Sequence, residues 1–343
     1  MALVPGPMAH CPVMRSLLAL SLSLALPWLG GCTASTSPAR GASSAPAPEE
    51  WKSPLYRDHP LVGRIWDART GQWLTPEALD AALGGARFVV LGETHDNADH
   101  HRLQAERVRA LTASGRQPAL AFEMLDAGQQ PLLDETRQRS PGDPDALARA
   151  VDWEHSGWPE WALYRPLFAV GLERGLPLVG ANLPRPEVRR LVMEGPGALA
   201  RETRARLGLD APVPEAQEKQ TREEMSESHC GQLPESLLGP MAFAQRARDA
   251  QMADRLLGTA TAAGGLLIAG AGHARTDRGV PAYVLRREPG LRVASLAFVE
   301  VDPEAREPHD YPLPYDYVWF TPAAEREDPC APLRAAPEKA PGK

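Results

Sequence analysis

Four polar side chains that can do chemistry follow an apolar run in the segment Phe88–Asn97. The run is short and rich in β-branched residues, which is typical of a buried strand. The chain then carries Glu93, His95, Asp96 and Asn97. Alternation along an extended strand end points Glu93 and His95 to the same side. An acid and an imidazole at the carboxyl end of a buried strand indicate a site, because open α/β sheets bind ligands there.

Similar groups follow three other candidate strands. Glu123 ends the second strand, Asn182 follows the third, and His273 and Arg275 follow the fourth. Because the carboxyl ends of parallel strands meet at one edge of the sheet, these side chains are expected to share a crevice with the first pair. The alternative is that each is a separate capping or solvated residue.

The two acids and two imidazoles at these strand ends fit two kinds of chemistry. Glu93, His95 and His273 suit a divalent metal, which imidazole and carboxylate ligands bind well. Together with Glu123 they also suit acid–base catalysis, with a carboxylate orienting each imidazole. The glycines near His273 lack the third glycine of a dinucleotide fingerprint, and no Gly-x-Ser-x-Gly elbow of an esterase is present.

The segment 152–166 is a second concentration of informative residues, with three of the chain's 8 tryptophans. Flat aromatic surface beside His155, Tyr164 and Arg165 suits a planar apolar ligand, and both Tyr and His can bind haem iron. The alternative is an aromatic helix that packs on the sheet, in which Tyr164 and Arg165 have structural hydrogen bonds.

Two further patches carry residues of interest. His229 and Cys230 lie side by side in a polar helical interval, where they either bind a metal or haem or form an ordinary helix end. Arg246 and Arg248 are either part of a solvated helix face or partners of a ligand carboxylate such as a haem propionate. Cys230 and Cys330 are either a disulfide or two free thiols.

The predicted fold class is α/β, with a mostly parallel β-sheet flanked by helices. A helix is expected between the first two strands, and a second from about Pro240 to Leu257, with the proline at its start. The intervals 128–168 and 184–239 are expected to form a helical subdomain or lid. The predicted strands are Phe88–Gly92, Ala119–Glu123, Leu176–Gly180, Leu266–Gly270, Val293–Val301 and Tyr317–Phe320.

The N-terminal sequence predicts a targeting signal. Arg15 precedes the apolar run Leu17–Leu26, which is too short to span a bilayer and suits a signal peptide. The run leads into Leu-Gly-Gly-Cys32, which resembles a lipobox and predicts lipidation of Cys32. The expected organisation is a signal peptide over 1–31, a flexible tether over 32–56, a folded domain over 57–322 and a disordered tail over 323–343.

Composition argues against nucleic acid as a partner. The chain has 37 basic and 44 acidic residues, a formal net charge of −7, and no basic tract or basic–aromatic stripe.

Several of these segments together resemble the haem-binding uptake family of bacterial lipoproteins called ChaN, within the Tiki and erythromycin esterase superfamily. The resemblance covers about Leu61–Pro322. It depends on Leu-Gly-Glu-Thr-His-Asp-Asn at 91–97 with His100-His101, Phe-Glu-Met at 122–124, Ser156-Gly157-Trp158 through Tyr164-Arg165-Pro166, and His229-Cys230-Gly231. Gln245–Asp249, Ala269–Tyr283 and the ending Tyr315–Phe320 also fit.

The resemblance implies haem binding and a role in haem or iron uptake at the envelope of a Gram-negative-type bacterium. The lipid anchor is expected in the outer membrane, and haem is expected within one chain or between the two chains of a homodimer. Tyr164, His155 or His229 would hold the iron, and arginines among Arg165, Arg246, Arg248 and Arg275 would hold the propionates.

The superfamily also implies an alternative. Its Tiki members are metal-dependent proteases and its esterases hydrolyse macrolide lactones, with Glu and His residues that correspond to Glu93, His95, Glu123 and His273. On this alternative the chain is a metal-dependent hydrolase in which these four residues are ligands or acid and base.

Overall fold

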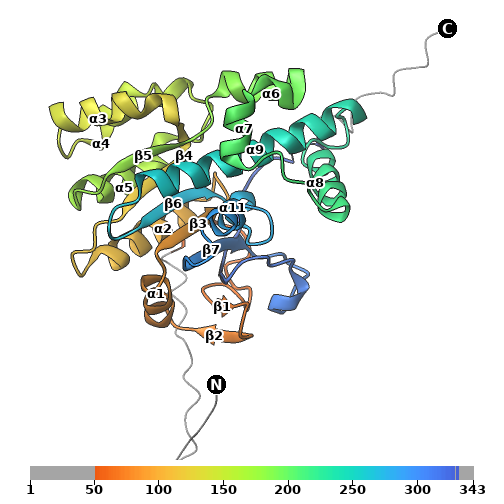
Figure 1. Cartoon of the computed structure of the whole chain (residues 1–343). Coiled ribbons are helices and arrows are strands. Elements are labelled where there is room, and N and C mark those ends of the chain that lie inside the picture. Colours follow the sequence, from red (N-terminus) through yellow and green to blue (C-terminus); the bar gives the residue numbers. More distant parts are fainter. Residues whose placement is uncertain (1–50, 329, 332–343) are drawn as a thin grey trace, which may run out of the picture. The chain divides into compact units, whose positions relative to one another are not determined.

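An eight-stranded sheet organises the computed structural model, which describes residues 51–328, 330 and 331 (Figure 1). The strand order is β2-β1-β8-β7-β3-β6-β4-β5, and the six strands from β8 to β5 run parallel. The predicted mostly parallel α/β fold is therefore confirmed. The strands are β1 (Ile65–Asp67), β2 (Gln72–Leu74), β3 (Phe88–Glu93), β4 (Ala119–Asp126), β5 (Leu178–Asn182), β6 (Gly265–Gly270), β7 (Val293–Glu300) and β8 (Tyr317–Thr321).

Helices occupy the connections between the parallel strands, including both intervals that were predicted to be helical. They are α1 (Pro76–Gly84), α2 (Ala98–Thr112), α3 (Gln130–Arg139), α4 (Pro144–Ala150), α5 (Trp161–Glu173), α6 (Arg185–Glu194), α7 (Arg201–Leu207), α8 (Glu215–Glu227), α9 (Glu235–Thr259), α10 (Ala271–Ala274) and α11 (Val280–Arg287). Short 3₁₀ turns are η2 (Ala127–Gln129), η3 (Trp153–His155), η4 (Gly195–Ala198) and η5 (Pro308–Asp310).

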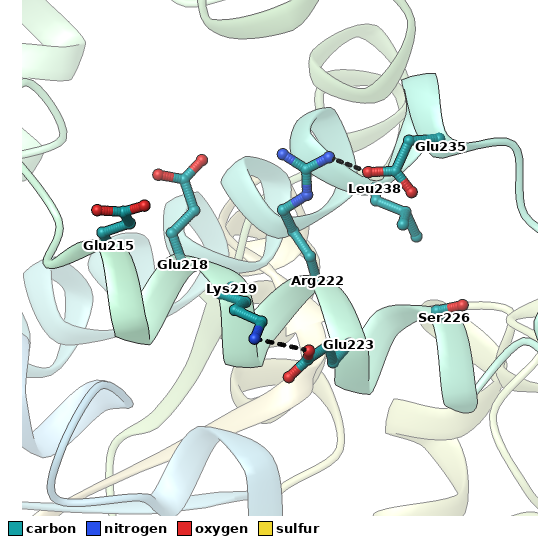
Figure 2. A pocket seen from close by; sticks show the side chains of 8 residues that line it. All are labelled: Glu215, Glu218, Lys219, Arg222, Glu223, Ser226, Glu235 and Leu238. Atoms are coloured by element: carbon teal, nitrogen blue, oxygen red, sulfur yellow. Dashed lines mark hydrogen bonds and ion pairs between the residues drawn. The ribbon is translucent and has the colours of Figure 1, made fainter.

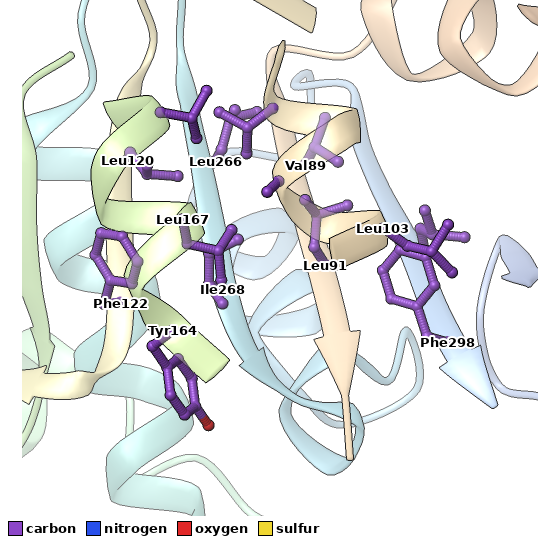
Figure 3. Close-up of a cluster of buried hydrophobic side chains, with 14 of the residues drawn as sticks. Val89, Leu91, Leu103, Leu120, Phe122, Tyr164, Leu167, Leu266, Ile268 and Phe298 are labelled. Atoms are coloured by element: carbon purple, nitrogen blue, oxygen red, sulfur yellow. The ribbon is translucent and has the colours of Figure 1, made fainter. Parts of the chain in front are cut away.

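Alternating side chains of the central strands build two hydrophobic cores, one on each face of the sheet. Val89 and Leu91 of β3 join the core that α2 and α5 cover. Phe88 and Val90 of the same strand join the core that α9 and α11 cover. Figure 3 shows the first core, in which Tyr164 lies at one end with its hydroxyl turned away from the apolar side chains. Burial on both faces explains the continuous apolar runs of these strands.

Three predicted elements have other bounds in the structure. Strand β4 continues past Glu123 to Asp126. Helix α9 begins at Glu235 rather than at Pro240, which lies inside the helix. An internal proline removes a single backbone hydrogen bond, and the long helix tolerates that loss here. Strand β5 begins at Leu178, after Pro177, and extends to Asn182.

The folded region is wider than the expected 57–322. Trp51 is buried, and the backbone N–H groups of Lys52 and Ser53 donate to the carboxylate of Asp99 at the start of α2. These residues were expected in the tether, but their hydrogen bonds fix them to the domain.

The C-terminal segment is also fixed. Arg326, which was expected in a disordered tail, forms ion pairs with Asp96 and Glu300. Cys330 forms a disulfide with Cys230, so the disulfide alternative holds. The predicted signal peptide, the lipidation site Cys32 and residues 332–343 of the tail lie outside the described residues. Within the described residues, no helix combines the length and apolar character needed to cross a membrane.

Candidate functional site

Four residues predicted at strand ends come together at the carboxyl edge of the sheet because their strands are neighbours. They are Glu93, His95, Glu123 and His273. Strand β6 lies between β3 and β4, and β5 pairs with β4 on its other side. Glu93 ends β3, opposite Gly270 of β6, and Glu123 lies in β4. His273 follows β6 directly. The expected convergence of strand ends is therefore observed, and we call these side chains and their partners the rim.

The first half of the rim centres on the buried carboxylate of Glu93. Its Oε1 lies 2.9 Å from Nδ1 of His95 and accepts a hydrogen bond of 2.8 Å from the Tyr164 hydroxyl. Its Oε2 lies 3.0 Å from Nδ1 of His101, an ion-pair distance without hydrogen-bond alignment. Nε2 of His101 lies 2.9 Å from the carbonyl oxygen of His95. One side chain from α2, His101, and one from α5, Tyr164, thus contact this carboxylate.

The charges of this half follow from its contacts. Burial alone would raise the pKa of Glu93, but His101 and His95 overcome it and lower that pKa to about 2. Burial opposes a charged imidazole at His101, yet Glu93 raises its pKa above the ordinary value. Burial and the Glu93 charge raise the pKa of Tyr164, so the phenol keeps its proton. Since an ionised carboxylate only accepts, Nδ1 of His95 carries the proton that Glu93 accepts.

The second half of the rim centres on Glu123, on the face covered by α9. Its Oε2 accepts a 2.7 Å hydrogen bond from the backbone N–H of Gly270. Its Oε1 pairs with Arg248 and lies 3.2 Å from Nε2 of His273. Nδ1 of His273 lies 2.6 Å from Oδ1 of Asp249. The arrangement is a buried imidazole between two carboxylates.

These contacts set the protonation of His273. Burial opposes its charge, but Glu123 and Asp249 raise its pKa to about 9. Burial also opposes the charge of Glu123, yet His273 and Arg248 hold its pKa well below the ordinary value. His273 is therefore an imidazolium at neutral pH, and both its nitrogens donate. It has no lone pair left for a metal in this state.

His95 connects the two halves. A Cβ on Gly270 would lie 2.9 Å from Nε2 of His95, so only glycine leaves room for this imidazole. The His95 side chain is 36% exposed, and its ring meets Trp158 edge-on with centroids 5.0 Å apart. Nε2 of His95 has no hydrogen-bond partner among the described residues. Burial opposes a charge on His95, yet its hydrogen bond to Glu93 and the charge of Glu123 raise its pKa above the ordinary value. Nε2 is accessible and is oriented by Glu93 through Nδ1, and it offers a lone pair once the imidazolium has lost its Nε2 proton.

Glycine in β3 positions the other imidazole. A Cβ on Gly92 would lie 2.7 Å from Cβ of Ala274 and 3.1 Å from Cα of Ala271. The missing side chain lets the short helix α10 pack against β3, and α10 carries His273.

The tryptophans of the aromatic segment have two different roles. Trp153 is buried, stacks edge-on with Trp161, and donates its indole N–H to the carbonyl oxygen of Pro159. Trp161 donates to Asp145. These two rings fit the packing alternative, whereas Trp158 is only partly buried and lies beside His95.

Several predicted ligand-binding residues lie apart from the rim or are already paired. His155 is exposed and pairs with Asp152, and His229 is exposed and bonds the carbonyl oxygen of Met225. No contact within the described part of the chain joins either imidazole to the rim. The predicted arginines have partners: Arg165 pairs with Asp145, Arg275 pairs with Asp277, and Arg246 bonds the Tyr283 hydroxyl and two carbonyl oxygens.

The predicted metal ligands Glu93, His95 and His273 do not form a metal centre in this conformation. Across the described residues, no group of three or more His, Cys, Asp or Glu side chains is arranged to hold a metal ion. Glu93 and His273 direct their polar atoms at other side chains of the rim instead.

Three cavities are formed by helices and loops around the domain, and two of them lie next to the rim. A cavity of about 630 Å³ is lined by Trp153, Trp158 and Trp161, and one of about 450 Å³ by Trp158, Arg248 and residues of α6. The third, of about 670 Å³, lies between α8 and the start of α9 (Figure 2). Its arginine and lysine pair with Glu235 and Glu223, and it contains no imidazole or phenol that could bind iron. Of these three, only the first two are lined by Trp158, whose ring contacts His95.

Sequence reasoning missed two rim residues. His101 and Asp249 complete the two halves, but each comes from a helix rather than from a strand end. A sequence signal existed for His101, which lies in the first turn of α2 in a His-His pair. Asp249 lay within a charged run that a solvated face explains equally well.

Comparison with known proteins gives one family and one fold. The model of the family described as "Haem-binding uptake, Tiki superfamily, ChaN" matches residues 79–284. ChaN of Campylobacter jejuni, whose structure is described as showing cofacial haem binding, is 22% identical with a TM-score of 0.60, over 74% of this chain and 95% of that chain. A mutant of the erythromycin esterase EreC is 17% identical with a TM-score of 0.40, over 74% of this chain and 80% of that chain. The comparison with curated proteins gave no match.

Proposed function

Because this chain belongs to the haem-binding uptake family ChaN of the Tiki superfamily, we propose that it binds haem at the rim and serves haem or iron uptake at the cell envelope. The observation that carries the proposal is the free Nε2 of His95. An imidazole whose Nδ1 proton is held by a carboxylate is the usual form of a metal-binding histidine. Haem supplies the iron, and the protein supplies the ligand and an aromatic wall.

His95 is proposed as the iron ligand in place of the three side chains expected from the sequence. Tyr164 is fully buried and donates its hydroxyl proton to Glu93, and its raised pKa disfavours the phenolate that iron requires. His155 and His229 have no contact with the rim among the described residues and no aromatic wall beside them. Trp158 gives His95 such a wall.

Lipid anchoring and outer-membrane location remain part of the proposal through the sequence around Cys32. A lipidated cysteine at this position would hold the domain at a membrane surface, where a haem carrier can meet its source or recipient. A homodimer that encloses two haems belongs to the same proposal, and is supported by the cofacial haem described for the Campylobacter jejuni relative.

The direct test is a titration of the purified chain with haemin, followed by the Soret band. Saturable binding at micromolar haemin, with a band position that differs from free haemin, is the expected result. A spectrum that stays the sum of free haemin and protein would contradict the proposal. Analytical ultracentrifugation with and without haemin then tests the dimer.

A second candidate function is hydrolysis, with His95 as the general base. It is favoured by the same geometry, because Glu93 fixes Nδ1 and leaves Nε2 able to accept a proton from water. A panel of esters and lactones, assayed with the chain and with His95→Ala, tests it with and without chelator. Turnover that is lost in the variant supports this candidate, and no turnover above the variant contradicts it.

A further inference from the structure

We infer that the Cys230–Cys330 disulfide is a redox latch on the carboxyl edge of the sheet, and that its reduction by a dithiol loosens the loop of His95 and opens the rim. The inference goes beyond the proposed haem binding, which supplies only one of its two readouts. We call the described residues 322–328 and 330 the strap.

The strap crosses the carboxyl ends of β8, β7 and β3, which are neighbours in the sheet. It continues from β8, and the backbone N–H of Ala324 donates to Glu300 at the end of β7. Arg326 pairs with the same Glu300 and donates two hydrogen bonds, of 2.6 and 2.9 Å, to the carboxylate of Asp96. Asp96 follows His95 in the chain, so the strap is fastened to the loop that carries the accessible imidazole of the rim.

The disulfide joins the strap to a second structure, the arm, which consists of α8, the start of α9 and the turn between them. Cys230 lies in this turn, and α8 packs along the start of α9 (Figure 1). Glu224 of α8 pairs with Arg275 and Arg278, which follow His273 in the chain. The disulfide therefore links a segment anchored beside His95 to an arm anchored beside His273, on the two sides of the rim.

The remaining fastenings of the strap and the arm are weaker than a covalent bond. The carboxylates of Asp96 and Glu224 are 45% and 41% exposed, and the Arg326 side chain is 37% exposed. Exposed ion pairs contribute little to stability and are screened by salt. Without the disulfide, the strap and the arm would be held to each other by no covalent bond, and the loop of His95 would lose the constraint that the bond adds.

The disulfide is placed where a reductant can reach it. Both cysteines are only partly buried, and exposed disulfides are the labile and regulatory ones. Cys230 has a φ of 61°, in a left-handed region that residues other than glycine rarely adopt. Once the bond is broken, this turn is free to take a more favourable backbone conformation.

The chemical step is thiol–disulfide exchange with a dithiol. One thiolate of the dithiol attacks a cysteine sulfur, breaks the S–S bond, forms a mixed disulfide and releases the other cysteine. The second thiol of the reductant then displaces the first cysteine. Two electrons and two protons pass to the protein, which ends with two thiols, and the dithiol ends as a cyclic disulfide.

The first test measures amide hydrogen exchange in the full chain without haem. One sample is reduced with tris(2-carboxyethyl)phosphine, alkylated with iodoacetamide and desalted, and its matched control is alkylated without reduction. Peptides covering 94–100 and 222–234 are expected to exchange about tenfold faster after reduction, whereas β6 in the core keeps its protection. Cys230→Ser/Cys330→Ser should exchange at the fast rate with or without the reductant.

Arg326→Gln tests the strap while the disulfide stays intact. It removes the pairs with Asp96 and Glu300, so exchange in 94–100 should become faster, whereas 222–234 should stay as in the oxidised wild type. Equal exchange in 94–100 for the oxidised and reduced wild type would overturn the latch. Loss of protection in β6 on reduction would also overturn it, because the bond would then hold the whole fold rather than this edge.

The second readout is the release of haemin to an excess of apomyoglobin, followed by the Soret band. Release is expected to be about tenfold faster from the reduced, alkylated chain than from the oxidised one. Equal release rates, with exchange in 94–100 accelerated, would contradict the opening of the rim. A wild type that takes up no haemin would contradict the proposed function, and the exchange experiment would still decide the latch.

Discussion

Oε1 of Glu93 and Nδ1 of His95 lie 2.9 Å apart, and this single contact decides which nitrogen of His95 is free. Without it the imidazole could present either nitrogen to a ligand. With it, the neutral imidazole keeps its proton on Nδ1 and has its lone pair on Nε2, next to the backbone of Gly270. The remaining contacts of Glu93 keep the carboxylate ionised and in place.

Replacing His95 by alanine is expected to weaken haemin binding at least tenfold and to shift the Soret band, because the proposed iron ligand is lost. His155→Ala is the matched control, since that imidazole is exposed and pairs with Asp152 alone. The affinity of this control should equal that of the wild type. Equal Soret spectra for wild type and His95→Ala would remove His95 from the site.

Two tryptophans of one segment are expected to respond in opposite ways to alanine substitution. Trp153→Ala should lower the free energy of unfolding by about 3–5 kcal/mol, because that ring is buried in the core. Trp158→Ala should change stability much less and weaken haemin binding instead. Urea denaturation and haemin titration of both variants measure the two effects, and a stability loss of equal size in both would show that Trp158 is only a core residue.

The pKa of His273 predicts how stability depends on pH. Because the folded pKa is about 9 and the ordinary value is 6.5, its contribution is fully present below pH 6.5 and is lost as the pH rises through 9. The free energy of unfolding should fall by on the order of 3 kcal/mol between these values. His273→Gln should flatten this part of the curve, and an unchanged slope in the variant would contradict the assignment.

The lowered pKa of Glu93 predicts that the free energy of unfolding falls as the solution is acidified. Its folded pKa is about 2 and its ordinary value is 4.5, so its contribution is present above pH 4.5 and is lost as the pH falls through 2. Denaturation curves between pH 5 and pH 2 should show this loss, and Glu93→Gln should reduce it. If Glu93→Gln loses as much unfolding free energy between pH 5 and pH 2 as the wild type does, other carboxylates cause the loss.

The Cys230–Cys330 disulfide closes a loop with a sequence separation of 100 residues. Cys230→Ser/Cys330→Ser is expected to lower the free energy of unfolding by about 2–4 kcal/mol, mainly through the entropy of the unfolded chain. Thiol titration of the denatured wild type, before and after reduction, checks that the bond forms. The 343-residue chain has four cysteines, so two titratable thiols before reduction and four after it are expected, and four before reduction would contradict the pairing.

The sequence was sufficient for the elements whose pattern is local. All six predicted strands are present, because an apolar run between polar ends is a strong local signal. Strands β1 and β2 were missed, since three residues are too few to show alternation. They depend on pairing at the sheet edge, where β1 pairs with β8 and β2 pairs with β1.

The candidate site was predictable only where it lies on strand ends. Topology carries Glu93, Glu123 and His273 to one edge once the sheet is known to be parallel. His101 and Asp249 reach the same carboxylate and imidazole from helices, and their direction depends on how each helix packs on the sheet. That rotation is set by tertiary contacts, which a single sequence does not specify.

The hydrogen bonds from Lys52 and Ser53 to Asp99 fix the position at which the described chain enters the domain. Asp99 lies in the first turn of α2, shortly after His95, so the described chain starts on the same edge of the sheet as the rim. If Cys32 carries lipid, the chain that leads from the anchor would enter the domain at this edge and not at the opposite ends of the strands.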